Sequence, residues 1–463
     1  MRLFLFVDRG GAGTIVEWTS DQILKLAPDS GSARSGRDLG AARKWVSLGC
    51  NDQACWGECQ GSGSVPYQTQ IDLEEPAFRC SCPSRKFPCK HALGLFLLYA
   101  EQRGVLSASA PPAWVDEWLT ARAKKAERRA KKTESAGDGE PVAVVDAAAQ
   151  ARRAADREAK VAAGLVELKR WLLDLVRQGL ASAQGRPYSF WESVAARMVD
   201  AQAPGAARLV HDLAGIPASG EGWPDRLLER LGRLLLLVEG YSRIADLPEP
   251  IQADLRSLIG WTHDQKELLG RPGVREQWFV LGRRIEIQDG LKVQRNWLWG
   301  QTTGRAALVL NFAAGNQPLD VSLVPGTGID AELVFFPSSW PLRALVKDRS
   351  GSPATIESMK GEPSLERAIE GYGAVLAVNP WIERLPLSLE GMTPSFRDGH
   401  WFIRDAEGYQ MSLSPRFDQG WWILACSGGN PIGVFGEFDG DSLRPLSLWN
   451  DRGFRSLPGA EDS

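Results

Sequence analysis

Several features that define large classes of proteins are missing from this chain of 463 residues. Its formal net charge is only −3, which excludes nucleic-acid binding through the overall electrostatic field, so any such binding has to come from a local patch. Apolar runs are short: residues 3–7, 92–100 and 234–238 fall well below the roughly 20 residues of a membrane-spanning helix, and the first is too short for a signal peptide. We therefore expect a cytoplasmic protein with no membrane partner.

Catalytic motifs are lacking as well. The sequence contains no Gly-x-Ser-x-Gly elbow, no Gly-Lys-Ser/Thr of a phosphate-binding loop and no His-Glu-x-x-His. Histidine is scarce, at four residues, and we interpret His211, His263 and His400 as surface or core polar residues rather than catalytic bases. The sequence therefore predicts no enzymatic activity.

Cysteine is too rare for a disulfide scaffold, with seven residues in the whole chain, but it is unevenly distributed. Six of the seven cysteines lie between positions 50 and 89. Such a cluster in a cytosolic protein indicates a metal site rather than cross-links. Cys426 stands alone in an apolar segment, and we predict it to be a buried core thiol.

The length of the chain exceeds what one hydrophobic core usually contains, and its composition changes along the sequence. The predicted segments are an N-terminal module at 14–120, a basic and Ala-rich linker helix at 121–160, a helical domain at 161–270 and a β-rich, Trp-containing domain at 271–456. Within the second segment, residues 135–146 have the composition of a loose linker.

Apolar spacing predicts the elements of these segments. Residues 67–80 alternate as a hairpin does, with its turn at 74–76, and a helix follows from His91 until Gly104 stops it. Helical faces are predicted from Leu165, Leu168, Leu172, Leu175 and Val176, and from Leu227, Leu228, Leu231 and Leu235. After residue 271 short strands alternate with turn residues, interrupted by one helix near 365–375, which is typical of an antiparallel meander or barrel. The predicted fold class is α+β: a small ββα module, a helical middle region and a mainly antiparallel β C-terminal domain.

The strongest motif lies at residues 80–91, Cys-Ser-Cys-Pro-Ser-Arg-Lys-Phe-Pro-Cys-Lys-His. On an extended strand the side chains of Cys80 and Cys82 leave the same face, and Cys89 and His91 fit the first turn of a helix after Pro88. Thiolate and imidazole are the ligands that tetrahedral zinc prefers. We predict one zinc ion per chain, bound by Cys80, Cys82, Cys89 and His91, which stabilises the ββα module. Four protein ligands leave no position for a reactive water, so the zinc is structural.

These residues resemble the SWIM zinc finger, whose signature is Cys-x-Cys, a variable spacer and Cys-x-His. The spacer here has six residues, and the segments 56–63 and 66–67 are similar to those of bacterial SWIM-finger proteins. The resemblance covers residues 20–105. It implies a DNA-binding or protein-interaction module of the kind also found beside Mutator-type transposases and Swi/Snf-type helicases, and it implies a partner system of an AAA-type ATPase with a von Willebrand A-like protein.

Two further patterns leave alternatives open. Cys50, Cys55 and Cys59 are interpreted as structural thiols; the alternative is a second zinc site, for which no histidine lies nearby. Tryptophan is abundant, at 18 residues, and we interpret it mainly as core, the alternative being a peptide or sugar groove. The tryptophans considered for this groove are Trp297, Trp299, Trp421 and Trp422, the last two of which, if on a strand, face opposite sides.

Basic residues gather in two places. Arg79, Arg85, Lys86 and Lys90 surround the zinc ligands and favour their deprotonation. Residues 121–132 carry seven basic residues against one acidic residue and no apolar face, which predicts a solvated helix. We therefore expect a non-catalytic adaptor that binds another protein; the alternative is a DNA- or RNA-binding protein that uses both basic groups.

Overall fold

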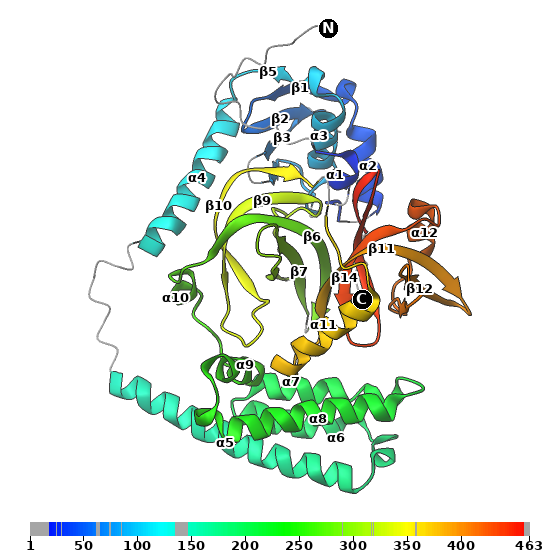
Figure 1. The fold of residues 1–463 in the computed structure, drawn as a ribbon. Helices are drawn as coiled ribbons and strands as arrows, with labels where there is room; N and C mark the ends of the chain where they lie inside the picture. The colour runs from blue at the N-terminus through cyan, green and yellow to red at the C-terminus, as the bar shows by residue number, and fades with distance from the viewer. Residues whose placement is uncertain are drawn as a thin grey trace.

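The structure is a computed structural model that describes residues 18–457, except 25, 29, 62–64, 74–75, 85, 135–146, 289, 316, 318 and 357–358. In Figure 1 an N-terminal module lies at the top, a β-rich region in the middle and a helical bundle at the bottom. The predicted α+β class is confirmed. In the described part of the chain, no helix combines the length and the apolar character needed to cross a membrane.

The N-terminal module is larger than the expected ββα unit. Its sheet has the order β4-β3-β2-β1-β5, formed by β1 (Trp45–Cys50), β2 (Ala54–Cys59), β3 (Tyr67–Asp72), β4 (Ala77–Cys80) and β5 (Ser107–Ala108). Strands β3 and β4 form the predicted hairpin, in which Thr69 is the cross-strand neighbour of Cys80. Strand β5 pairs in parallel with β1, which the sequence pattern did not predict.

Three helices pack on one another and on this sheet: α3 (Lys90–Glu101) contacts β2, β3 and β4, and α1 (Ser20–Leu24) and α2 (Ser30–Leu39) contact α3. Every residue of α3 from His91 to Tyr99 is buried. A helix that is apolar on all sides has to be enclosed, and here α2 and the sheet both contact it. A Cβ atom on Gly94 would lie 2.6 Å from Leu39 Cβ, so the close approach of α2 and α3 requires glycine at this position.

Two helices extend across the bounds of the predicted linker helix at 121–160. Helix α4 (Ala113–Glu134) begins earlier, because Val115 and Leu119 pack against Trp56 of the sheet. Residues 135–146 lie outside the described part of the chain. The Ala-rich residues that follow begin α5 (Ala147–Arg177), so the predicted boundary at residue 161 falls inside a continuous helix.

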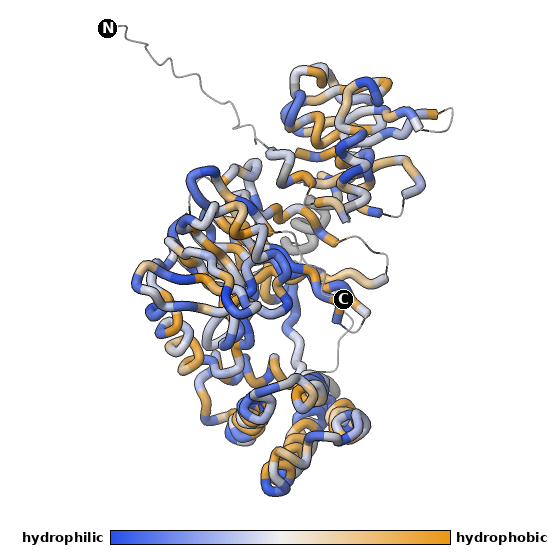
Figure 2. Tube along the Cα trace, turned by 90° about the vertical axis from the view of Figure 1, so that its right-hand side faces the viewer, coloured by the Kyte–Doolittle hydropathy of each residue, from blue (hydrophilic) through white to orange (hydrophobic). Residues whose placement is uncertain are grey.

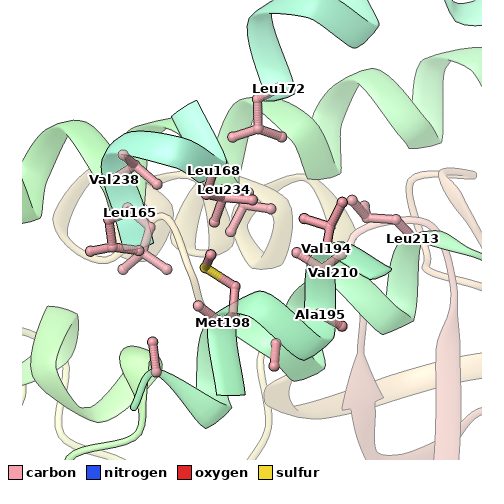
Figure 3. Close-up of a cluster of buried hydrophobic side chains, with 14 of the residues drawn as sticks. Leu165, Leu168, Leu172, Val194, Ala195, Met198, Val210, Leu213, Leu234 and Val238 are labelled. Carbon is pink, nitrogen blue, oxygen red and sulfur yellow. The ribbon is translucent and has the colours of Figure 1, made fainter. Parts of the chain in front are cut away.

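The helical region is a bundle with one continuous core (Figure 3). It contains α5, α6 (Tyr188–Asp200), α7 (Pro204–Leu213), α8 (Trp223–Ser242) and α9 (Glu249–Ile259), followed by the short α10 (Gln265–Leu269). Leu165, Leu168 and Leu172 point into the core, as predicted. Val176 and Leu228 were assigned to the same faces but are 45% and 52% exposed, because each follows a core leucine directly and a helix turns about 100° per residue. Apolar and polar residues alternate along these helices in Figure 2.

The C-terminal region contains two antiparallel sheets, as expected for an antiparallel meander or barrel. The first has the order β10-β9-β6-β7-β8, from β6 (Val274–Gln288), β7 (Leu291–Gly300), β8 (Ala306–Ala314), β9 (Thr327–Phe335) and β10 (Ala344–Thr355). The second has the order β13-β12-β11-β14-β15-β16, from β11 (Leu385–Arg397), β12 (His400–Arg404), β13 (Gln410–Ser412), β14 (Ile432–Phe438), β15 (Leu443–Asn450) and β16 (Gly453–Ser456). The sheets pack together through Leu281, Trp297, Phe435 and Leu446, all of which are buried.

Two helices accompany the second sheet. Helix α11 (Leu365–Val378) is the predicted one. Helix α12 (Gly420–Ser427) corrects the expectation that Trp421 and Trp422 face opposite sides of a strand, since a short apolar run has no periodicity that separates helix from strand. Cys426, predicted to be buried, is only half-buried on this helix.

The three parts are in direct contact. Val324 of the β-rich region is part of the core of the N-terminal module. The indole nitrogen of Trp381, which precedes β11, donates a hydrogen bond to the carbonyl oxygen of Arg233 in the bundle, at 3.0 Å. The β-rich region therefore contacts both the N-terminal module and the bundle.

Candidate metal centre

The four predicted ligands come from two elements that meet at one end of the module. Cys80 is the last residue of β4, and Cys82 lies two residues beyond it. One more backbone hydrogen bond follows the strand, from Ser81 N to Gln68 O at 2.9 Å. Because β4 ends at Cys80, Cys82 belongs to the loop, which corrects the expectation that both cysteines lie on one strand.

The other pair belongs to helix α3. Cys89 is its N-cap residue, with the extended backbone typical of that position, and its carbonyl oxygen accepts the first helical bond from Leu93 N at 3.0 Å. His91 is the second helical residue. The local sequence thus places both donors at the helix start, facing the end of the hairpin.

The four donor atoms form a compact group. One atom each from Cys80, Cys82, Cys89 and His91 lies within 4.8 Å of all the others, and Cys80 Sγ is 3.8 Å from His91 Nδ1. Zinc bonds of about 2.3 Å to sulfur and about 2.0 Å to nitrogen, at tetrahedral angles, give a sulfur–nitrogen separation of about 3.6 Å. The arrangement therefore fits one zinc ion bound by three thiolates and Nδ1 of the imidazole.

Comparison with known proteins gives the same assignment. The model of the SWIM zinc finger family matches residues 67–100, which contain the hairpin, the four ligands and most of α3. The chain therefore contains a SWIM-type zinc finger. The model of the SWIM-associated four-helix bundle domain matches residues 156–259, the bundle from α5 to α9. No curated protein and no solved structure matches the chain.

The SWIM finger is stabilised by residues beyond its four ligands. Cys89 and His91 are 5% exposed, whereas Cys80 and Cys82 are half-buried. The Thr69 hydroxyl lies 3.2 Å from Cys80 Sγ, and the Tyr67 and His91 ring centroids are 5.0 Å apart. Sequence reasoning missed Thr69, although the hairpin register, counted back from the turn, places it opposite Cys80.

The thiols of the finger differ in acidity. The pKa of Cys80 is lowered to about 4, first by a hydrogen bond from the Cys89 thiol and then by bonds from His91 and Thr69, against the opposing effect of burial. The pKa of Cys89 is raised because its thiol donates that bond and because it is buried. Burial also raises the pKa of Cys82. Zinc displaces the protons from these thiols, so its binding releases protons and weakens as the pH falls.

The other cysteines of the module are all buried in its core. Cys50, Cys55 and Cys59 are at most 9% exposed. Among the described residues, the ligand set of the finger is the one group found that could hold a metal. Burial raises the pKa of Cys59, and the negative charge of Cys80 in the finger raises it further.

The predicted basic surface around the finger is described in part. Arg79, Lys86 and Lys90 are exposed, while Arg85 lies outside the described residues. These cations lie beside a site whose three thiolates and one Zn²⁺ leave a charge of −1, which favours metal binding.

Proposed function

We propose that this SWIM-finger protein is a non-catalytic adaptor in which zinc holds the N-terminal module together and the β-rich region binds another protein. SWIM fingers bind zinc and serve protein or nucleic-acid interactions, and four protein ligands leave the metal no open position for substrate or water. In this proposal zinc has a structural role only. The reducing cytoplasm, where thiols persist, suits such a protein.

A surface cluster of three aromatic rings supports the protein partner most directly. Phe396 of β11 and Trp401 of β12 are cross-strand neighbours with ring centroids 4.9 Å apart, and Trp421 of α12 lies 5.2 Å and 5.0 Å from them. Trp421 is 62% and Phe396 46% exposed. Exposed tryptophan on a rigid support is typical of the residues that dominate protein–protein binding energy.

The support of this cluster is fixed by the fold. A Cβ atom on Gly420 would lie 2.2 Å from the Trp401 ring, so the start of α12 sits directly on that ring. The rings are therefore held in place before a partner binds, which lowers the entropy lost on association. Trp297 is fully buried and Trp422 packs against the core, as the interpretation of these tryptophans mainly as core residues expected. Trp421 alone of the four is largely exposed, so the four do not together line the groove that was the alternative.

The test is binding of a purified partner to the wild type and to Trp421→Ala. The partner is first identified by affinity purification from the native cell, where the SWIM resemblance suggests an AAA-type ATPase or a von Willebrand A-like protein. We expect Trp421→Ala to weaken binding about 30-fold, the effect of losing roughly 2 kcal/mol at a dominant contact. Phe312→Ala is the control, because Phe312 is 55% exposed on β8, which belongs to the other sheet of the β-rich region. Equal affinities for all three proteins would overturn the proposal.

Nucleic-acid binding is the second candidate, and helix α4 favours it. The basic stretch 121–132 is helical, and Lys124 is exposed. Arg122 is already engaged, because its Nε lies 3.0 Å from an Asp72 carboxylate oxygen and its guanidinium lies 5.4 Å from the centre of the Trp118 ring. Any phosphate contacts would therefore fall to the basic residues that follow Arg122.

This candidate is tested by binding to DNA and RNA at two salt concentrations. If about four residues contact phosphates, the logarithm of affinity should fall with the logarithm of salt with a slope of roughly −3 to −4 on duplex DNA. Changing Lys124, Lys125, Arg128 and Arg129 together to Gln should abolish this dependence. Equally weak binding by both proteins would dismiss the candidate and leave the adaptor.

A further inference from the structure

A cavity of about 330 Å³ lies in the β-rich region, far along the chain from the zinc finger. It is bordered by β6, β14, β15, the residue before β11 and the loop between β13 and α12. The residues that line it are Arg284, Arg384, Ser414, Pro415, Arg416, Glu437, Asp439, Ser442 and Arg444. Arginine is the commonest of these described lining residues, and none of them is aromatic.

The carboxylates in and beside this cavity are already paired. Glu437 is 2% exposed and accepts hydrogen bonds from Arg284 at 2.9 Å, from Arg295 Nε at 3.1 Å and from the Trp297 indole at 2.7 Å. Arg284 also lies 2.9 Å from Glu286, which is bonded in turn to Arg384. These contacts fix the positions of the buried guanidinium groups and leave Glu437 and Glu286 no role as binding groups for a cation.

The third carboxylate is engaged by its own turn. Asp439 Oδ1 accepts hydrogen bonds from the backbone N–H groups of Asp441, at 3.1 Å, and Ser442, at 2.8 Å. Such a carboxylate closes the β14–β15 turn rather than binding a ligand. The Ser442 hydroxyl donates to the same carboxylate, at 3.4 Å and 3.5 Å from its two oxygens. The donors that the lining offers to a ligand are therefore guanidinium groups and the hydroxyl group of Ser414.

The charges around the cavity do not cancel. Among the residues that the structure describes, the lining and the paired network contain the arginines at 284, 295, 384, 416 and 444 and the carboxylates of Glu286, Glu437 and Asp439, which leaves two positive charges in excess. Arg284 and Arg444 are both less than 9% exposed, and Arg416 is exposed. In a partly buried site, two excess positive charges stabilise a dianion.

We propose that this cavity binds the phosphate group of a small phosphorylated molecule. Guanidinium groups match the oxygens of phosphate with paired hydrogen bonds, and the Ser414 hydroxyl adds one further donor. The volume is near the lower limit of small-molecule sites, which suits a phosphate and a small group attached to it. Because the lining residues that the structure describes include no aromatic ring, recognition rests on the phosphate rather than on stacking with a base.

The test is calorimetric titration of the full-length protein with inorganic phosphate, glycerol phosphate, pyrophosphate and succinate at constant ionic strength. We expect saturable binding of the phosphates and none of succinate. Arg416→Gln should raise the Kd about tenfold, the effect of one lost charged hydrogen bond. Arg416 is exposed on a loop, so this variant should fold normally, which circular dichroism checks. Arg452→Gln, exposed in the turn between β15 and β16, is the control and should leave the Kd unchanged.

Comparing inorganic phosphate with glycerol phosphate distinguishes the possible sources of the phosphate group. Tighter binding of glycerol phosphate than of inorganic phosphate would identify a phosphate ester, and the reverse order would identify free phosphate; both support the assignment. Absence of saturable heat for every phosphate up to about 10 mM would overturn it, as would binding of succinate alone. An equal loss in Arg416→Gln and Arg452→Gln would also overturn it, because the effect would then reflect overall charge.

Discussion

Replacing Cys89 with Ser removes one of the four donors of the SWIM finger and should unfold the N-terminal module alone. A structural zinc site of this kind contributes about 10–16 kcal/mol of apparent binding free energy at neutral pH. A domain of this size is stable by only about 5–15 kcal/mol in total, so a weakly bound or absent metal leaves the module without net stability. The damage centres on α3, because Cys89 caps that helix and nine consecutive residues of it lie in the core.

Zinc content and hydrogen exchange together measure this effect. Elemental analysis should find one zinc per wild-type chain and much less than one in Cys89→Ser. Hydrogen exchange followed by mass spectrometry should show α3 amides exchanging as in an unfolded chain. The amides of α8, in the separate core of the bundle, should stay protected.

Cys50→Ser is the matched control within the same module. Cys50 is 9% exposed in the core of the module, and it is not one of the four ligands. This variant should keep its zinc and its protected α3. Full zinc occupancy in Cys89→Ser, or loss of zinc in Cys50→Ser, would refute the ligand assignment.

Three further outcomes follow from the packing and charges. Burial raises the pKa of Glu437, but Arg295, Arg384, Trp297 and Arg284 outweigh this effect and lower the pKa from the ordinary 4.5 to about 2. The ionised Glu437 therefore stabilises the fold by roughly 3 kcal/mol at neutral pH. Urea unfolding should show this contribution lost between about pH 5 and pH 2 in the wild type but not in Glu437→Gln. Leu168→Ala should lower the free energy of unfolding by about 2–5 kcal/mol in denaturant titrations, whereas Val166→Ala, at a side chain that is 49% exposed, should change it by less than about 0.5 kcal/mol. Gly433→Ala would place a Cβ atom 1.9 Å from the Trp449 ring and should lower the thermal midpoint by the equivalent of about 1–3 kcal/mol, while Gly371→Ala, which has open space on α11, should not.

The zinc finger and the general layout could be predicted from the sequence because both rest on local order. The four ligands lie within residues 80–91, so a short segment of chain carries the whole signature and little long-range folding is needed to bring them together. Leucine spacing similarly identified the faces of α5 and α8, since the period of a helix is fixed by its backbone. Where that signal was weak, as in the apolar run that forms α12, the prediction of a strand was wrong.

Tertiary structure alone decided which distant residues meet. The pairing of β5 with β1, the aromatic cluster of Phe396, Trp401 and Trp421, and the arginine-lined cavity all depend on how separate elements pack. Thr69 beside Cys80 is an intermediate case, because the register of one hairpin fixes it. The sequence by itself therefore determined the metal and its ligands, whose spacing is local, whereas the exposed aromatic surface and the excess of positive charge arise only when the sheets and α12 bring residues from distant parts of the chain together.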